Sequence, residues 1–230
     1  MTIAEKTGRT AANAKAAAAR PAEIVREYGP FPGADKVAGV SHDGQRVWFA
    51  GGDRLVAFDP DSGQVERTLA RVGDAGTAFD GKHLWQIAET RIDKIDPASG
   101  DVVASIPAPG SGSDSGLAWA DGSLWVGQYR GRKIHRIDPA TGAVLRTIES
   151  NRFVTGVTWV DGELWHGTWE GDASEIRRID PESGAVLDRL EMPAGAGVSG
   201  LESDGADLFY AGGGESGKVR AVRRPRSVHS

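Results

Sequence analysis

Three ionisable side chains in this sequence have types and positions suited to proton transfer. Asp74 precedes an apolar segment, Glu89 follows the next one, and His166 lies directly after a Leu-Trp pair. Carboxylate and imidazole groups act as general acids and bases when they are held beside a reacting group. We therefore predict Glu89, Asp74 and His166 as the candidate catalytic residues.

A second set of side chains is suited to holding a ligand, because binding sites combine aromatic walls with a few placed polar groups. Trp169 has no aromatic counterpart in three of the other repeats described below, which favours a role in lining a pocket. The candidate ligand-binding residues are Trp169, Gln128, Tyr129, Arg130, Glu170, Arg152, Asp114 and Thr155.

The sequence gives little support for a zinc site, a Ser-His-Asp triad or a phosphate-binding loop. The chain has no cysteine, and the remaining histidines lack partners at metal-ligand spacing, so no zinc site is indicated. No Ser-His-Asp order can be assembled, and the glycines at 212–214 precede no predicted helix, as a phosphate loop would require. We expect no cofactor. A divalent ion, Mg²⁺ or Ca²⁺, held mostly by backbone and water would leave no spacing signature, so its ligands stay unknown.

The elements that position these residues belong to a repeat. The segment Gly116 to Ile148 predicts a short strand, an Asp121-Gly122 turn, two further strands, an Asp-Pro-x-x-Gly turn that begins at Asp138, and a fourth strand. Four strands in series form an antiparallel meander.

The unit recurs five times. An Asp-Gly turn precedes each apolar-aromatic pair, from Val47-Trp48 to Leu208-Phe209, and the Asp-Pro-x-x-Gly turn returns in all but the fifth copy. A period of about 40 residues with four short strands indicates a β-propeller. We predict an all-β, five-bladed propeller over residues 21–224, with blades at about 38–70, 75–108, 115–149, 155–192 and 199–224.

The fifth unit lacks a fourth strand, and the segment Glu23 to Tyr28 resembles the outer strand of the repeat. We therefore predict that residues 23–28 complete blade five and close the ring, which removes an unpaired edge. Residues 1–20 are alanine-rich and are expected to be flexible or helical, and residues 225–230 form a tail.

This architecture explains why the candidate residues would meet. The start of the first strand and the end of the second strand of each blade reach the same mouth of the central tunnel. Asp74, Asp114 and Thr155 lie at strand starts, whereas Glu89, Gln128 and Trp169 lie at strand ends. We expect a single site at that mouth.

Composition limits the partners. A net charge of −5 gives no reason to expect nucleic acid or an anionic membrane, and no apolar run suits a signal peptide core or a membrane span. We predict a cytoplasmic protein, with a monomer favoured and a small molecule or peptide as partner. The basic run Arg220, Arg223, Arg224 and Arg226 is predicted to be a solvated tail, with a contact surface as the alternative.

The chain from about residue 23 to 223 resembles the plant and bacterial type of glutamine cyclotransferase (glutaminyl-peptide cyclotransferase). The segments that carry the resemblance are EIVREYGPFPGADKVAGVSHDG, LWQIAETRIDKID, VTGVTWVDGELWHGTWEGDASEIRRIDPESGAVL and SGLESDGADLFYAGGG. The family is a five-bladed propeller that converts N-terminal glutamine to pyroglutamate and releases ammonia. The repeat residues are also similar to streptogramin (virginiamycin B) lyase-like propellers.

Most functional positions of the cyclotransferase family are changed in this chain. Trp169 is retained. Family glutamate, tryptophan, asparagine and lysine positions hold other residues here, namely Ala75, Ser115, Thr155, Gly156, Glu89 and Gly213. The resemblance therefore implies the fold more strongly than the reaction.

Three functions follow as hypotheses. The first is a cyclotransferase-like propeller that binds a small molecule or peptide at the tunnel mouth, or an enzyme of altered specificity. The second is a true cyclotransferase in which Asp74 or Glu89 replaces the lost acid. The third is a Mg²⁺-dependent streptogramin-lyase-like enzyme with His166 as the base and Glu170 or Glu89 near the metal.

Overall fold

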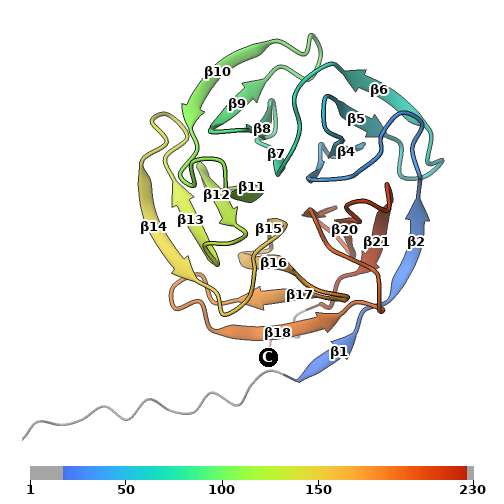
Figure 1. The fold of residues 1–230 in the computed structure, drawn as a ribbon, viewed down its shortest axis with the longest axis vertical. Helices are drawn as coiled ribbons and strands as arrows, with labels where there is room; N and C mark the ends of the chain where they lie inside the picture. Colours follow the sequence, from blue (N-terminus) through green and yellow to red (C-terminus); the bar gives the residue numbers. More distant parts are fainter. Residues whose placement is uncertain (1–17, 227–230) are drawn as a thin grey trace, which may run out of the picture.

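The computed structural model describes residues 18–226, which form five antiparallel sheets arranged as blades around a central axis (Figure 1). Blade one contains β3 (Val40–His42), β4 (Val47–Ala50), β5 (Leu55–Phe58) and β6 (Val65–Leu69). Blade two contains β7 (Thr77–Phe79), β8 (Leu84–Ala88), β9 (Arg91–Ile95) and β10 (Val102–Pro107). Blade three contains β11 (Asp114–Ala120), β12 (Ser123–Gln128), β13 (Lys133–Ile137) and β14 (Val144–Glu149). The predicted five-bladed, all-β fold is confirmed.

The last two blades receive strands from the N-terminal end of the chain. Blade four contains β15 (Val157–Val160), β16 (Glu163–Glu170), β17 (Ala173–Ile179) and β18 (Val186–Glu191), and β1 (Ala19–Pro21) is added parallel to β18. Blade five contains β19 (Leu201–Ser203), β20 (Leu208–Gly212) and β21 (Val219–Arg223), and β2 (Ile24–Tyr28) completes it. The strand β1 was not predicted. Ala19 and Arg20 are therefore in a strand rather than in a helix, and the rest of the predicted extension, residues 1–17, lies outside the described residues.

Ring closure by residues 23–28 is confirmed. The strand β2 pairs antiparallel with β21, with Tyr28 opposite Val219 and Ile24 opposite Val222. Glu27 accepts hydrogen bonds from Lys218 at 2.8 Å and from Arg220 at 2.7 Å. The pairing covers the edge of β21, which would otherwise be open.

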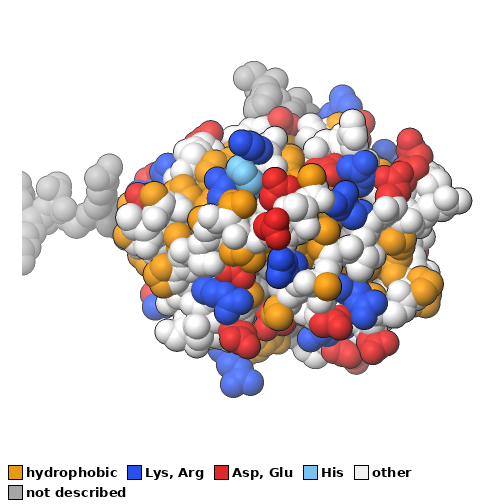
Figure 2. Space-filling view, turned by 90° about the horizontal axis from the view of Figure 1, so that it is seen from above, with side chains coloured by type: hydrophobic (Ala, Val, Ile, Leu, Met, Phe, Trp, Pro, Cys, Tyr) orange, Lys and Arg blue, Asp and Glu red, His pale blue; other side chains and the backbone are white. Residues whose placement is uncertain are grey.

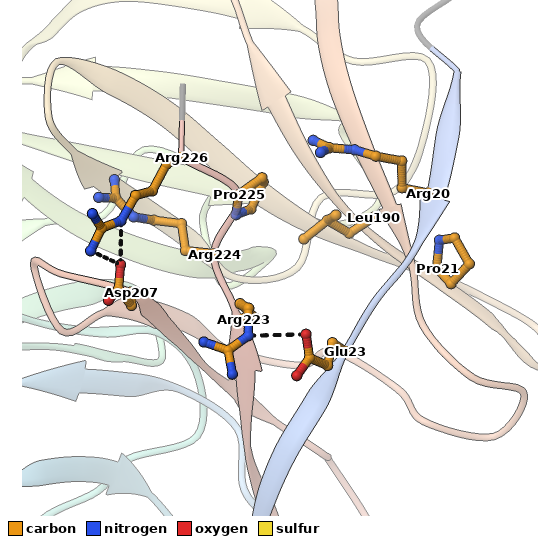
Figure 3. A pocket seen from close by; sticks show the side chains of 9 residues that line it. All are labelled: Arg20, Pro21, Glu23, Leu190, Asp207, Arg223, Arg224, Pro225 and Arg226. Carbon is orange, nitrogen blue, oxygen red and sulfur yellow. Dashed lines mark hydrogen bonds and ion pairs between the residues drawn. The ribbon is translucent and has the colours of Figure 1, made fainter. Parts of the chain in front are cut away.

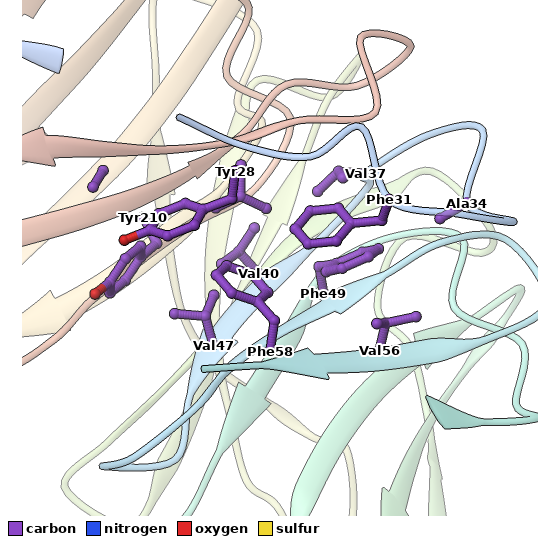
Figure 4. Close-up of a cluster of buried hydrophobic side chains, with 12 residues drawn as sticks. Tyr28, Phe31, Ala34, Val37, Val40, Val47, Phe49, Val56, Phe58 and Tyr210 are labelled. Atoms are coloured by element: carbon purple, nitrogen blue, oxygen red, sulfur yellow. The ribbon is translucent and has the colours of Figure 1, made fainter. Parts of the chain in front are cut away.

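An apolar cluster packs the seam between blades five and one. Figure 4 shows Tyr28 and Phe31, from the N-terminal segment, against the aromatic side chains of blades one and five. The rings of Tyr28 and Phe58 lie 4.8 Å apart, and those of Phe31 and Phe49 lie 4.6 Å apart. Tilted aromatic pairs of this kind add to the stabilisation from burial.

The Asp-Gly turn fixes the tryptophan of its own blade. Asp43 accepts a hydrogen bond from Trp48 Nε1 at 2.8 Å, and Asp80 accepts one from Trp85 Nε1 at 2.9 Å. The same aspartates also accept bonds from backbone N–H groups of the turn. In these two blades one carboxylate therefore satisfies both the turn and a buried indole, whereas in blade four Trp165 Nε1 donates to Glu163 at 3.1 Å.

A ring of glycines brings the five inner strands into contact. The ring consists of Gly39, Gly76, Gly116, Gly156 and Gly200. A Cβ on Gly39 would lie 2.4 Å from the carbonyl oxygen of Ala75, and one on Gly156 would lie 2.1 Å from the nitrogen of Leu201. Only glycine allows the neighbouring backbones to approach this closely.

Side chains two residues beyond these glycines form the next layer around the axis. Four of them are small, namely Ser41, Ala78, Ala118 and Thr158, and the fifth is Glu202. Glu202 accepts a hydrogen bond from Thr158 Oγ1 and another from the backbone N–H of Ser203 at 2.8 Å. It is the one long side chain in this layer.

The outer surface carries mixed charge. Figure 2 shows acidic and basic side chains interspersed on the side of the molecule that faces the viewer. Within residues 18–226, no helix is present that has the length and apolar character to cross a membrane.

Candidate functional site

Aromatic residues of blades three and four form a shelf at the predicted mouth of the tunnel. The rings of Tyr129 and Phe153 stack with centroids 4.6 Å apart and an interplanar angle of 29°. The guanidinium of Arg132 lies 4.5 Å from the Phe153 ring centroid, and Tyr129 Oη donates to the carbonyl of Trp169 at 3.1 Å. We call Tyr129, Phe153, Arg132 and Trp169 the aromatic shelf. It combines π faces with a positive charge.

Trp169 extends the shelf toward blade five. Its Nε1 donates to the carbonyl of Gly171 at 3.0 Å, which fixes the ring orientation. The ring lies over two glycines, because a Cβ on Gly197 would come within 2.4 Å of it and one on Gly214 within 2.6 Å. The half-buried indole therefore needs glycine at both positions, and Trp169 connects the two blades.

Arg152 and Glu170, two of the predicted ligand-binding residues, form an ion pair at the edge of the shelf. Glu170 also accepts a hydrogen bond from the backbone N–H of Phe153 at 3.0 Å. Burial acts to raise the pKa of Glu170, but the Phe153 N–H and the Arg152 guanidinium outweigh it and lower this pKa. The carboxylate therefore stays ionised and holds the Phe153 loop in place.

Asp114 and Gln128 are opposite each other in the pairing of β11 with β12. Asp114 accepts the backbone N–H of Gly110 at 2.9 Å, so its carboxylate fixes the loop that enters blade three. Burial raises the pKa of Asp114, and the bonds from Gly110 and Gln128 oppose this shift. Asp114 therefore contacts Gln128 and the loop that contains Gly110, and this loop enters blade three.

Thr155 lies at a position that links neighbouring blades. The equivalent Ser115 donates through Oγ to the carbonyl of Val154 in the next blade at 2.8 Å, and Ser199 donates in the same way to Val37 at 2.5 Å. Thr155 is buried, and within residues 18–226 its Oγ1 has no hydrogen-bond partner. Its environment is that of an inter-blade contact.

Asp74 and Glu89 both belong to blade two, and both are exposed. Arg91 is the charge they share: Asp93 is the main cause of the raised pKa of Arg91, and Glu89 and Asp74 add to it. Glu89 has a φ of 57°, so it occupies the left-handed position of the turn between β8 and β9. Both candidate acids therefore act on Arg91 of blade two, whereas Trp169 belongs to β16 of blade four.

His166 is placed where a ligand at the mouth cannot touch it. Its side chain is fully buried on the face of β16 that also carries Leu164, which packs against blade three. Nδ1 lies 3.0 Å from the carbonyl of Gly167, and burial lowers the pKa of His166 to about 4. The imidazole is neutral and enclosed between blades, so the structure does not support the predicted role of His166 as a catalytic base.

Three residues that the sequence did not single out define or surround the site. Phe153 and Arg132 belong to the shelf, and Glu202 lies in the tunnel layer. Arg130, a predicted ligand-binding residue, is exposed next to Tyr129, and its contact with a ligand stays a prediction. Residues 18–226 contain no group of three or more His, Cys, Asp or Glu side chains that could hold a metal ion.

Comparison with known proteins shows that the fold is similar to solved β-propeller structures. Neither models of protein families nor curated protein sequences match the chain. Among solved structures, the glutaminyl cyclase of Myxococcus xanthus has a TM-score of 0.73 at 17% identity, over 90% of this chain and 97% of that chain. The chain is a propeller of this structural type.

Two other propellers are less similar. A virginiamycin B lyase from Staphylococcus aureus has a TM-score of 0.50 at 18% identity, over 87% of this chain and 70% of that chain. The WD40 β-propeller domain of Doa1 has a TM-score of 0.53 at 18% identity, over 83% and 64%. Identities this low concern the fold, so the function of the cyclase-like propeller has to be argued from its own residues.

Proposed function

We propose that this cyclase-like propeller binds a small molecule or peptide on the aromatic shelf at the tunnel mouth. The observation that carries the proposal is the stack of Arg132, Phe153 and Tyr129, which a hydrogen bond from Tyr129 joins to the backbone carbonyl of Trp169. Such a surface offers π stacking and a cation to a planar or acidic ligand.

The shelf is rigid before a ligand arrives, which favours binding. Glu170 fixes the Phe153 loop, Tyr129 donates to the backbone of blade four, and Gly197 and Gly214 seat the indole. A surface that is already ordered loses little conformational entropy when it binds. A cytoplasmic location and a monomeric state stay predictions from the sequence.

The test is a thermal-shift screen of the protein against N-terminal glutamine peptides, divalent metals and a metabolite library. A ligand that binds only the folded state raises the unfolding midpoint. We expect a hit among the peptides or metabolites, and we expect Arg132→Gln to weaken it by about tenfold because a cation–π and charge contact is lost.

Arg26→Gln is the matched control. Arg26 also lies over an aromatic ring, 4.8 Å from the centroid of Tyr28, but it belongs to the outer strand β2. Its removal should leave ligand affinity unchanged. The absence of any hit, or equal losses in both variants, would contradict a site on the shelf.

One observation supports a second candidate function. Asp74 and Glu89 are exposed carboxylates that both act electrostatically on Arg91, so either is a candidate for the acid that glutamine cyclisation requires. If this cyclotransferase alternative holds, N-terminal glutamine peptides release ammonia, and Asp74→Asn or Glu89→Gln abolishes the release. A chain that binds such peptides without ammonia release is a binding protein.

A further inference from the structure

A cavity of about 430 Å³ lies at the seam where the N-terminal and C-terminal ends of the described chain meet. Figure 3 shows its lining. The N-terminal segment with Arg20, Pro21 and Glu23 lies on one side, and the C-terminal segment after β21 lies on the other. The lining residues are Arg20, Pro21, Glu23, Leu190, Asp207, Arg223, Arg224, Pro225 and Arg226. We call this cavity the seam groove. None of the residues that line the groove belongs to the aromatic shelf.

Two arginines of the basic run, which was predicted to be a solvated tail, are buried in the fold. Arg220 and Arg224 are buried, and Arg224 donates to Asp161 of blade four at 2.6 Å and to the carbonyl of Ala206 at 2.8 Å. This part of the basic run was therefore misjudged, because Arg220 pairs with Glu27 of the closing strand and Arg224 pairs with Asp161 of the neighbouring blade. Arg223 and Arg226 remain accessible at the groove.

Three accessible guanidinium groups surround the groove. The side chains of Arg20 and Arg223 are each 52% exposed, and that of Arg226 is 76% exposed. Each also contacts one carboxylate: Arg223 Nε donates to Glu23 at 2.9 Å, Arg226 donates to Asp207 at 2.6 Å, and Arg20 pairs with Asp188. A guanidinium has five N–H donors, so these contacts leave others for a ligand.

The walls of the groove are fixed by the backbone. The N–H of Arg223 donates to the carbonyl of Glu23 at 2.9 Å, and that of Arg224 donates to the carbonyl of Asp207 at 2.7 Å. Ala22 is held to Glu191 by a further bond of 2.7 Å. The arginines therefore project from segments that are already in place, over a floor that contains Leu190 and two prolines.

We propose that the seam groove binds a phosphate-bearing ligand through Arg20, Arg223 and Arg226. Four arginines converge on the groove, and each contacts one carboxylate through only part of its guanidinium. Planar guanidinium forks match the oxygens of a phosphate and bond to them in pairs.

The existing ion pairs do not prevent this binding. Glu23 and Asp207 are 60% and 45% exposed, and exposed pairs of this kind are held only weakly. A dianion that contacts two or three guanidinium groups at once can replace single carboxylates on them. The site is independent of the aromatic shelf, so failure of one proposal leaves the other unaffected.

Titration calorimetry with inorganic pyrophosphate, at constant ionic strength, tests the proposal on the full chain. We expect saturable binding, and we expect Arg223→Gln and Arg226→Gln each to weaken it by about tenfold, as for the loss of a charge-assisted hydrogen bond. Arg223→Lys keeps the charge but loses the fork, so it should also bind more weakly than the parent protein.

Arg54→Gln is the matched control. Arg54 is an accessible arginine whose Nε donates to Asp53 at 2.9 Å, in the same way as Arg223 donates to Glu23, but it lies outside the groove. Its substitution should leave pyrophosphate binding unchanged. Absence of saturable binding by the parent protein, or an equal loss in Arg54→Gln, overturns the proposal. Unfolding midpoints of all variants show whether each is folded.

Discussion

At the scale of single residues, burial sets the chemistry more than residue type does. His166 and Glu202 are both ionisable, yet His166 is enclosed between blades and Glu202 points into the layer around the tunnel axis. The sequence indicated His166 as a base and did not single out Glu202. His166 shares a strand face with Leu164, and this alternation already indicates an inter-blade position.

Glu202 predicts how stability depends on pH. Burial raises its pKa to about 7 from 4.5, while Thr158 and the Ser203 N–H act in the opposite direction. Between these values the folded state holds a proton that the unfolded chain has lost, so the free energy of unfolding falls as pH rises from 4.5 to 7. The loss is about 3 kcal/mol.

Glu202→Gln removes the titration and keeps the size of the side chain. We expect urea unfolding at a series of pH values to show a flatter profile for the variant, which should be the more stable protein at pH 7 and above. Parallel profiles for the two proteins would show that Glu202 does not carry this dependence.

A second residue-scale prediction concerns the seat of Trp169. Gly197→Ala would place a Cβ 2.4 Å from the indole, so the ring must move. We expect a destabilisation of about 1–3 kcal/mol and a changed tryptophan emission. In the Trp169→Leu background the same substitution should cost less, and an equal cost in both backgrounds would mean that the two residues are not coupled.

At the scale of elements, the strands of the repeated blades could be predicted from the sequence, whereas β1 and the loop with Phe153, which do not repeat, could not. The blades were predictable because each carries the same turn signals, and closure by residues 23–28 followed from one missing strand. The strand β1 has only three residues and joins β18 through its backbone, so no alternation marks it. Phe153 escaped notice because it lies in a loop between blades rather than at a strand end.

Removal of the closing strand tests its role. A chain that lacks residues 1–28 loses β1, β2 and the Tyr28 ring of the apolar cluster. We expect a markedly lower thermal midpoint, because β21 becomes an open edge and the cluster is exposed. A chain that lacks residues 1–17 keeps every described strand and is the control, and equal midpoints for the two truncations would contradict closure by β2.

At the scale of the whole molecule, the five-bladed ring is a scaffold whose mouth carries the proposed function. Similar propellers include a glutaminyl cyclase and a virginiamycin B lyase, so the architecture alone does not select one reaction. The catalytic candidates divide in this ring: Asp74 and Glu89 lie on blade two, whereas the aromatic shelf lies on blades three and four.

The most direct test of this account is hydrogen–deuterium exchange on the protein with and without the strongest ligand from the screen. Binding to the shelf should slow exchange at the amides of residues 129–132, 150–156 and 169–172, because these loops carry the shelf residues. The Asp-Gly turns lie at the other end of the inner strands, away from the predicted mouth. Exchange at their amides should be unchanged. Protection confined to these turns, or to the outer strands, would contradict a binding site at the predicted mouth.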